Sequence, residues 1–111
     1  MNWNHLTSEE QLENIKKESE NQPVLIFKHS TRCSISATAL SRFERSWSDE
    51  KAGNLKPYYL DLIAFRPISN KIANDFGVEH ESPQVLIIDK GKSVYDASHY
   101  DIVFDEIAAA V

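Results

Sequence analysis

Residues 28–40 of the chain read KHSTRCSISATAL, and two patterns meet within this stretch. The apolar run VLIF comes directly before it and is short and β-branched enough for a buried strand. At its other end, Leu40, Phe43 and Trp47 recur every three or four residues, which is the helical period. We therefore expect the only cysteine, Cys33, to lie where a strand ends and a helix begins.

The length of 111 residues is typical of one domain and is sufficient for a hydrophobic core. Hydrophobic residues make up 41% of the chain and charged residues 26%, which are ordinary values for a folded protein and argue against extended disorder. We expect a single domain that covers residues 1–111.

The charge pattern and the cysteine count limit the compartment and the partners. The formal charge is −5, and no lysine and arginine cluster is dense enough to bind a nucleic-acid backbone. No stretch approaches the roughly 18 apolar residues that cross a bilayer, and the first residues show no signal-peptide pattern. One cysteine cannot form an internal disulfide, and a free thiol survives best in a reducing compartment. We expect a cytoplasmic protein that binds neither nucleic acid nor membrane.

Helical and strand patterns alternate along the chain. Pairing rules place the first two strands parallel, with a right-handed crossover between them, and make the last two strands an antiparallel hairpin. The order α-β-α-β-α-β-β-α predicts an α/β protein, a three-layer α/β/α sandwich with a mixed four-stranded sheet. The expected helices cover about 8–19, 33–47, 67–77 and 102–111, and the expected strands cover 24–28, 57–62, 85–88 and 93–95.

Cys33 is the residue whose position suggests chemistry. Free backbone N–H groups and the positive end of the helix dipole would face its sulfur, and Arg32 adds a positive charge, so each favours thiolate over thiol. A thiolate attacks disulfides, and a low pKa also makes that sulfur a better leaving group. The alternative is an inert, buried cysteine, which is common among free cysteines. The position at a helix start favours the reactive interpretation.

Ser36 follows Cys33 by three residues, on the same side of the first helical turn. A second cysteine would be needed there to resolve a mixed disulfide within the chain. The Ser36 hydroxyl can donate to a Cys33 thiolate and favour the charged form, or it can simply cap the helix. The spacing alone does not separate these two roles.

Ser82 and Pro83 precede the most apolar strand pattern. Pro83 is either a cis-proline or a proline that begins a strand, where it costs no ladder hydrogen bond. The four histidines form no metal-binding pattern with the cysteine, so we expect no metal site. His29 remains a candidate for influencing the titration of Cys33, and Asp61 is interpreted as a polar strand end.

The string HSTRCSISA at residues 29–37 resembles the motif of the monothiol bacilliredoxins of the YtxJ type, in which Cys-Pro-Ile-Ser follows a His-Ser-Thr-like strand end. More broadly, a strand followed by TRCSIS, and a Ser-Pro before an apolar hairpin and a last helix, are similar to thioredoxin-like proteins. The similarity covers roughly residues 23–111. It implies a thioredoxin-like fold.

The resemblance also implies a site. Pro83 would be cis and face Cys33, and the main chain of Ser82 would be free to pair with a bound thiol or peptide. We expect Thr31 and Ser34, which flank the cysteine motif, to contribute to substrate binding together with Ser82 and Pro83. The expected site therefore has the nucleophile on one side and the proline on the other.

The activity implied by the resemblance is a thiol–disulfide exchange that serves redox homeostasis. In this family the cysteine attacks a mixed disulfide between a protein and bacillithiol, releases the protein thiol, and carries bacillithiol on its own sulfur. We therefore expect a monothiol oxidoreductase with Cys33 as nucleophile and with Arg32 and Ser36 stabilising the thiolate. It would act as a monomer on S-thiolated proteins, with bacillithiol or a similar small thiol as co-substrate and no tightly bound cofactor.

Two residues depart from the patterns of these families. Ser34 stands where the bacilliredoxin motif usually has proline, which removes a stiffening ring from the first helical position and leaves the identity of the small thiol open. Phe27 stands where dithiol thioredoxins hold a buried acid. That acid serves a resolving cysteine, so its absence agrees with a monothiol mechanism.

Two other functions fit the same resemblance. One is an iron–sulfur cluster carrier like the monothiol glutaredoxins, in which Cys33 of two chains and two small thiols would hold the cluster. Ile35 argues against it, because those proteins carry a small glycine where the cluster approaches. The other is a binding module that keeps the fold and has lost catalysis.

Overall fold

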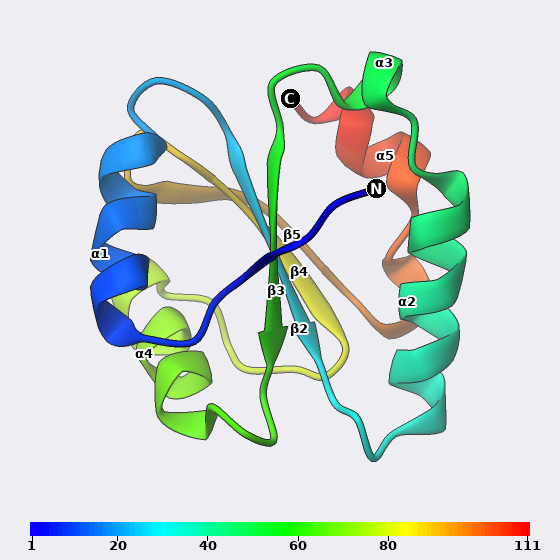
Figure 1. The fold of residues 1–111 in the computed structure, drawn as a ribbon, viewed down its shortest axis with the longest axis horizontal. Coiled ribbons are helices and arrows are strands. Elements are labelled where there is room, and N and C mark those ends of the chain that lie inside the picture. The colour runs from blue at the N-terminus through cyan, green and yellow to red at the C-terminus, as the bar shows by residue number, and fades with distance from the viewer.

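A mixed five-stranded sheet runs through the centre of the protein (Figure 1). The computed structural model describes residues 1–111. In the sheet the strand order is β1-β3-β2-β4-β5, with β2 parallel to β3 and antiparallel to β4. The strands are β1 (Asn4–His5), β2 (Val24–His29), β3 (Lys56–Asp61), β4 (Gln84–Asp89) and β5 (Lys92–Ser98).

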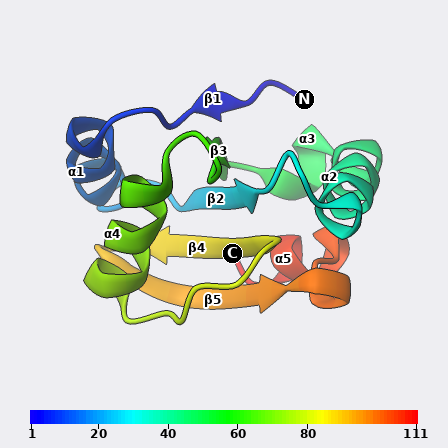
Figure 2. The ribbon, with the colours of Figure 1, turned by 90° about the horizontal axis from the view of Figure 1, so that it is seen from below.

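Helices cover both faces of this sheet (Figure 2). Helices α1 and α4 pack on one face, and α2 and α5 pack on the other. The α-helices are α1 (Glu9–Glu18), α2 (Ser34–Ser46), α3 (Asp49–Ala52), α4 (Arg66–Phe76) and α5 (Phe104–Ala109), and a 3₁₀ turn, η1, covers His99–Asp101. The predicted α/β/α layering is confirmed.

Strand β2 is buried along its whole length, because successive side chains enter two separate cores. Phe27 belongs to the core under α2 and α5, and Ile26 belongs to the core under α1 and α4. The same alternation carries into the last two residues of the strand. Lys28 is directed toward α4, where it bonds Ser69, and His29 is directed toward α2.

Local sequence signals explain where several elements begin and end. Ser8 caps α1 and forms a capping box with Gln11. Pro67 lies in the first turn of α4, and Gly77 ends that helix with a φ of 67°, in the left-handed region that glycine tolerates best. Strands β4 and β5 form the expected antiparallel hairpin, which turns at Lys90 and Gly91. No helix is both long enough and apolar enough to cross a membrane.

The expected number of four strands is wrong by one. Strand β1 has only two residues, too few for any periodic pattern, and it forms because Asn4 and His5 pair with Tyr58 and Tyr59 of β3. The segment between α2 and β3, where no helix was expected, contains the short helix α3, capped by the side chain of Ser48. The last helix is shorter than expected, since α5 ends at Ala109 and leaves Val111 outside it.

Candidate functional site

Cys33 is the N-cap residue of α2, as the change of pattern predicts. Its N–H donates to the Ser30 carbonyl at 3.2 Å, and its carbonyl accepts from the Ala37 N–H at 3.0 Å. The side chain is partly exposed, and its sulfur accepts no hydrogen bond from the first-turn amides of α2. The thiol is therefore held at the helix start by its main chain while its sulfur stays available to a second molecule.

The residues on either side of Cys33 are open to solvent. Thr31 and Arg32 precede it on the surface, and Ser34 follows it there. Ile35 is also exposed, to 41%, which places an apolar side chain beside the thiol. Arg32 forms no ion pair, so its charge is free to act on an anion at the Cys33 sulfur.

Ser36 does not make the hydrogen bond to Cys33 that the sequence suggested. Its fully buried hydroxyl instead accepts from the Ser30 N–H at 3.0 Å and lies 2.7 Å from Nδ1 of His29. A hydroxyl has one proton and two lone pairs, so these two partners use most of its capacity. Ser36 therefore ties the first turn of α2 to the end of β2, and any effect that it has on Cys33 passes through this loop.

His29, at the end of β2, is the sheet residue whose side chain contacts Ser36 in the first turn of α2. It is only 7% exposed, and its ring lies 5.7 Å from that of Tyr59. Burial lowers the pKa of His29 below its usual value, although Asp61, Glu44 and the contact with Ser36 oppose the shift. His29 is therefore neutral at pH 7, with one ring nitrogen free to accept. The side chain of His29 contacts Ser36 and not Cys33, so its influence on the titration of Cys33 stays a prediction.

Ser82 and Pro83 lie at the end of the sheet from which the chain leaves β2 toward Cys33. Gln84 pairs with Lys28 across β4 and β2, so the residues just before Gln84 lie beside the chain that leaves β2 toward the cysteine. The Ser82–Pro83 peptide bond is cis, and the Pro83 carbonyl accepts from the His99 N–H at 3.0 Å. Ser82 takes part in none of the turn, loop and cap hydrogen bonds, and its Oγ is buried without a partner. The polar groups of Ser82 are thus unpaired at the end of the sheet from which the chain leaves β2 toward Cys33.

Comparison with known proteins assigns this arrangement to a family. The family model of the monothiol bacilliredoxin BrxC matches residues 4–107. The chain belongs to the monothiol bacilliredoxin family. A solved structure described as a candidate oxidoreductase with a thioredoxin fold is 34% identical, with a TM-score of 0.81, and the match covers 96% of this chain and 90% of that one. The expected family is confirmed, and with it the assignment to thioredoxin-fold thiol oxidoreductases.

More distant structures show how widely the bacilliredoxin fold is shared. The thioredoxin Mala s 13 of Malassezia sympodialis is 16% identical with a TM-score of 0.73, over 98% of this chain and 87% of that one. Oxidised thioredoxin from Plasmodium falciparum is 13% identical with a TM-score of 0.72, over 97% of this chain and 96% of that one. At these identities the likeness concerns the fold alone, and it confirms the predicted thioredoxin-like class.

Sequence reasoning missed a buried polar cluster on the other face of the bacilliredoxin sheet. Lys28 is fully buried and donates to the Ser69 carbonyl of α4 at 3.2 Å, and His80 lies within hydrogen-bond distance of both Ser69 and Arg66. Gln84 is also buried, and its Oε1 has no partner. The one available signal was a lysine that directly follows four apolar strand residues, which looked like an ordinary strand end.

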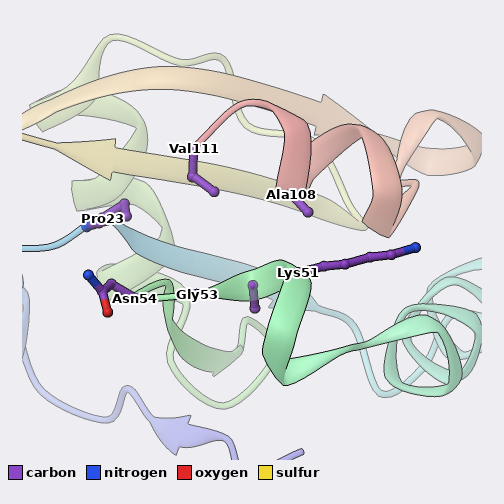
Figure 3. A pocket seen from close by; sticks show the side chains of 7 residues that line it. Pro23, Lys51, Gly53, Asn54, Ala108 and Val111 are labelled. Carbon is purple, nitrogen blue, oxygen red and sulfur yellow. The ribbon is translucent and has the colours of Figure 1, made fainter.

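Cys33 lines neither of the two cavities of the protein. A cavity of about 270 Å³ lies between α3 and the C-terminal residues, lined by residues that include Pro23, Asn54 and Val111 (Figure 3). It is at the opposite end of the sheet from Cys33, near the start of β2. The Cys33 side chain is instead partly exposed at the surface.

Ser36→Ala is expected to lower the free energy of unfolding by about 1–3 kcal/mol, because it leaves the Ser30 N–H and His29 Nδ1 buried without a partner. Urea unfolding measures this change. Ser34→Ala is the matched control, since Ser34 is exposed in the same turn and its loss should stay within about 0.5 kcal/mol. Equal effects of the two substitutions would contradict the role given to Ser36.

Proposed function

We propose that the protein removes bacillithiol from mixed disulfides with proteins, using Cys33 as its single nucleophile. The observation that carries this proposal is a partly exposed lone cysteine at the start of α2, at the same end of the sheet as a cis Ser82–Pro83 bond, in a chain of the monothiol bacilliredoxin family. A second thiol within the chain is absent, so the exchange must be completed by another molecule.

The proposed step is a thiol–disulfide exchange. The Cys33 thiolate attacks the bacillithiol sulfur of the mixed disulfide, and a new bond forms between these two sulfurs. The original disulfide bond breaks, and its electron pair leaves with the substrate protein's sulfur, which then takes a proton from solvent. No net oxidation occurs, because one disulfide replaces another. A second bacillithiol, or a reductase, then releases the first bacillithiol from Cys33.

The surrounding residues have separate roles in this proposal. In this proposal the N-terminal end of α2 and the free charge of Arg32 stabilise the negative charge that the Cys33 sulfur carries during the exchange. The unpaired main-chain groups of Ser82, beside Pro83, would bind the main chain of a substrate as a short added strand. Thr31 and Ser34 would contact the substrate from the cysteine side, where both are exposed.

The proposal also covers the co-substrate and the setting. Bacillithiol, or a small thiol of similar chemistry, acts as a co-substrate, and no tightly bound cofactor takes part. The partners are S-thiolated proteins, not nucleic acids or membranes. The protein acts as a monomer in the cytoplasm, where a reducing environment keeps Cys33 free between turnovers.

The identity of the small thiol is tested with one reporter protein loaded separately with bacillithiol, glutathione or coenzyme A. We expect the bacillithiol-loaded reporter to be reduced at least about tenfold faster than the other two, a difference of about 1.4 kcal/mol in the transition state. Release of the reporter thiol is followed by a fluorescent thiol probe. Equal rates with all three reporters would indicate a general thiol–disulfide exchange and would contradict a preference for bacillithiol.

A further inference from the structure

The segment that carries Ser82 and Pro83 is tied to helix α4 through one side chain. His80, two residues before Ser82, lies with Nε2 3.0 Å from Nη1 of Arg66 and with Nδ1 3.1 Å from Oγ of Ser69. Both partners belong to the first half of α4. His80 is the residue of this segment whose side chain bonds to α4, so the position of the segment depends on it.

The Arg66 contact fixes the protonation of His80. A guanidinium group only donates, so Nε2 of His80 must accept and therefore carries no proton. The proton of the neutral ring is then on Nδ1, which donates to the Ser69 hydroxyl. A doubly protonated His80 could not accept from Arg66. The hydrogen bond between His80 and Arg66 of α4 therefore requires the neutral imidazole ring of His80.

Strand β2 is linked to the same point of α4. Lys28, five residues before Cys33, donates to the Ser69 carbonyl, while the Ser69 hydroxyl meets His80. At the other end of the segment, Nε2 of Gln84 donates to the Glu79 carbonyl at 2.8 Å. Ser69 therefore joins the strand that leads to the nucleophile with the segment that carries the cis-proline.

We propose that His80 is a positioning residue for the thiol–disulfide exchange. It holds the Ser82–Pro83 segment at a fixed place beside Cys33, so that a substrate with a peptide chain binds an ordered wall. The inference rests on the proposed function, because it concerns the binding of a protein disulfide. It assigns His80 to substrate binding and leaves the intrinsic reactivity of the Cys33 sulfur to the helix start.

The charges around His80 set the direction of its pH response. Burial lowers the pKa of His80, and Lys28 of β2 and Arg66 of α4 lower it further by repulsion, while Glu81 of the same segment opposes them. The ring is therefore neutral at pH 7 and gains its second proton only below its ordinary pKa, near 6.5. Protein binding should therefore stay constant between pH 7 and 8 and weaken only below pH 6.5.

The test compares wild type, His80→Ala and His80→Gln on a thiolated reporter protein between pH 5 and 8. At pH 7.5 we expect His80→Ala to raise KM about five- to tenfold with kcat nearly unchanged. His80→Gln should recover part of the lost affinity, since its amide offers one acceptor for Arg66 and one donor for Ser69. Wild-type KM should rise toward that of His80→Ala as the pH falls below 6.5, while KM of His80→Gln should not follow this rise.

His99→Asn is the matched control. His99 is an exposed histidine 3.7 Å from Glu81 of the same segment, it lies outside the Arg66–Ser69 contacts, and asparagine tolerates its positive φ of 55°. It should leave KM and its pH profile unchanged. Alkylation of Cys33 by iodoacetamide should be equally fast in all four proteins. A fall in kcat or in alkylation with His80→Ala, or a KM that equals wild type at every pH, would overturn the proposal.

Hydrogen exchange separates this inference from the function on which it rests. Amides of residues 79–84 should exchange faster in His80→Ala than in wild type, and faster in wild type at pH 5.5 than at pH 7.5 after correction for intrinsic exchange. This measurement needs no turnover. A wild type that reduces no thiolated protein but shows these differences would refute only the proposed function, whereas unchanged exchange would refute the role of His80.

Discussion

Replacing Cys33 by serine is expected to lower the rate of reporter reduction by at least about a thousandfold, to the uncatalysed level. A serine hydroxyl has a far higher pKa than a thiol and cannot exchange with a disulfide, and the chain has no other cysteine. The measurement is the release of the reporter thiol with wild type and variant at equal concentration.

The substitution should leave the fold intact. The Cys33 side chain is partly exposed and makes no capping hydrogen bond, and serine is itself a good N-cap residue. Thermal unfolding should therefore show a midpoint equal to or slightly above that of wild type. Reporter reduction by the folded serine variant at more than a few per cent of the wild-type rate would exclude Cys33 as the nucleophile.

Lys28→Met is expected to raise the free energy of unfolding at pH 7 by about 1–2 kcal/mol. Burial, with repulsion from Arg66, lowers the pKa of Lys28 from 10.5 to about 8. That difference corresponds to a penalty of about 3 kcal/mol on the charged amine in the folded protein. Methionine is similar in length and avoids the penalty, but it loses the hydrogen bond to the Ser69 carbonyl, which reduces the gain.

The stability difference between Lys28→Met and wild type should change with pH. Because the folded pKa of Lys28 is depressed, the unfolded chain binds more protons between about pH 8 and 10.5, and wild-type stability rises across that window relative to the methionine variant. The advantage of Lys28→Met should therefore be largest below pH 8 and shrink toward pH 10.5. Urea unfolding at pH 7 and pH 10 measures both differences.

Lys71→Met serves as the control for the loss of a lysine. Lys71 lies on α4 and pairs with Asp75 and Glu13 near the surface, where ion pairs contribute little, so its loss should change the free energy of unfolding far less than the loss of Lys28. A Lys28→Met protein less stable than wild type at pH 7, by an amount that does not change with pH, would show that the buried ammonium stabilises the fold.

The junction between β2 and α2 was predictable because the signals there are local. A β-branched apolar run changes to helical spacing within a few residues, and both elements form where expected, with Cys33 between them. The hairpin of β4 and β5 was equally clear, since an apolar run meets a Lys-Gly turn. The family motif then gave the cis form of Pro83, which no pattern of hydrophobicity reports.

The remaining parts depend on contacts between distant residues. Strand β1 exists only because β3 offers it an edge, and two residues carry no period of their own. The partner of Ser36 is set by where His29 lies in the folded sheet. Lys28 and Ser69 are 41 residues apart in the chain, and only the packing of α4 on β2 brings them together. A lysine after an apolar strand gives no indication of that partner.

The measurement that tests the central claim most directly is the intact mass of the protein after a single turnover. Equimolar protein and bacillithiol-loaded reporter are mixed, the reaction is quenched with acid, and the intact masses of both proteins are measured by mass spectrometry. We expect Cys33 to gain the mass of one bacillithiol while the reporter loses it, with none transferred to Cys33→Ser. A mass equal to protein plus reporter, or no added mass while the reporter is reduced, would contradict transfer of the small thiol to Cys33.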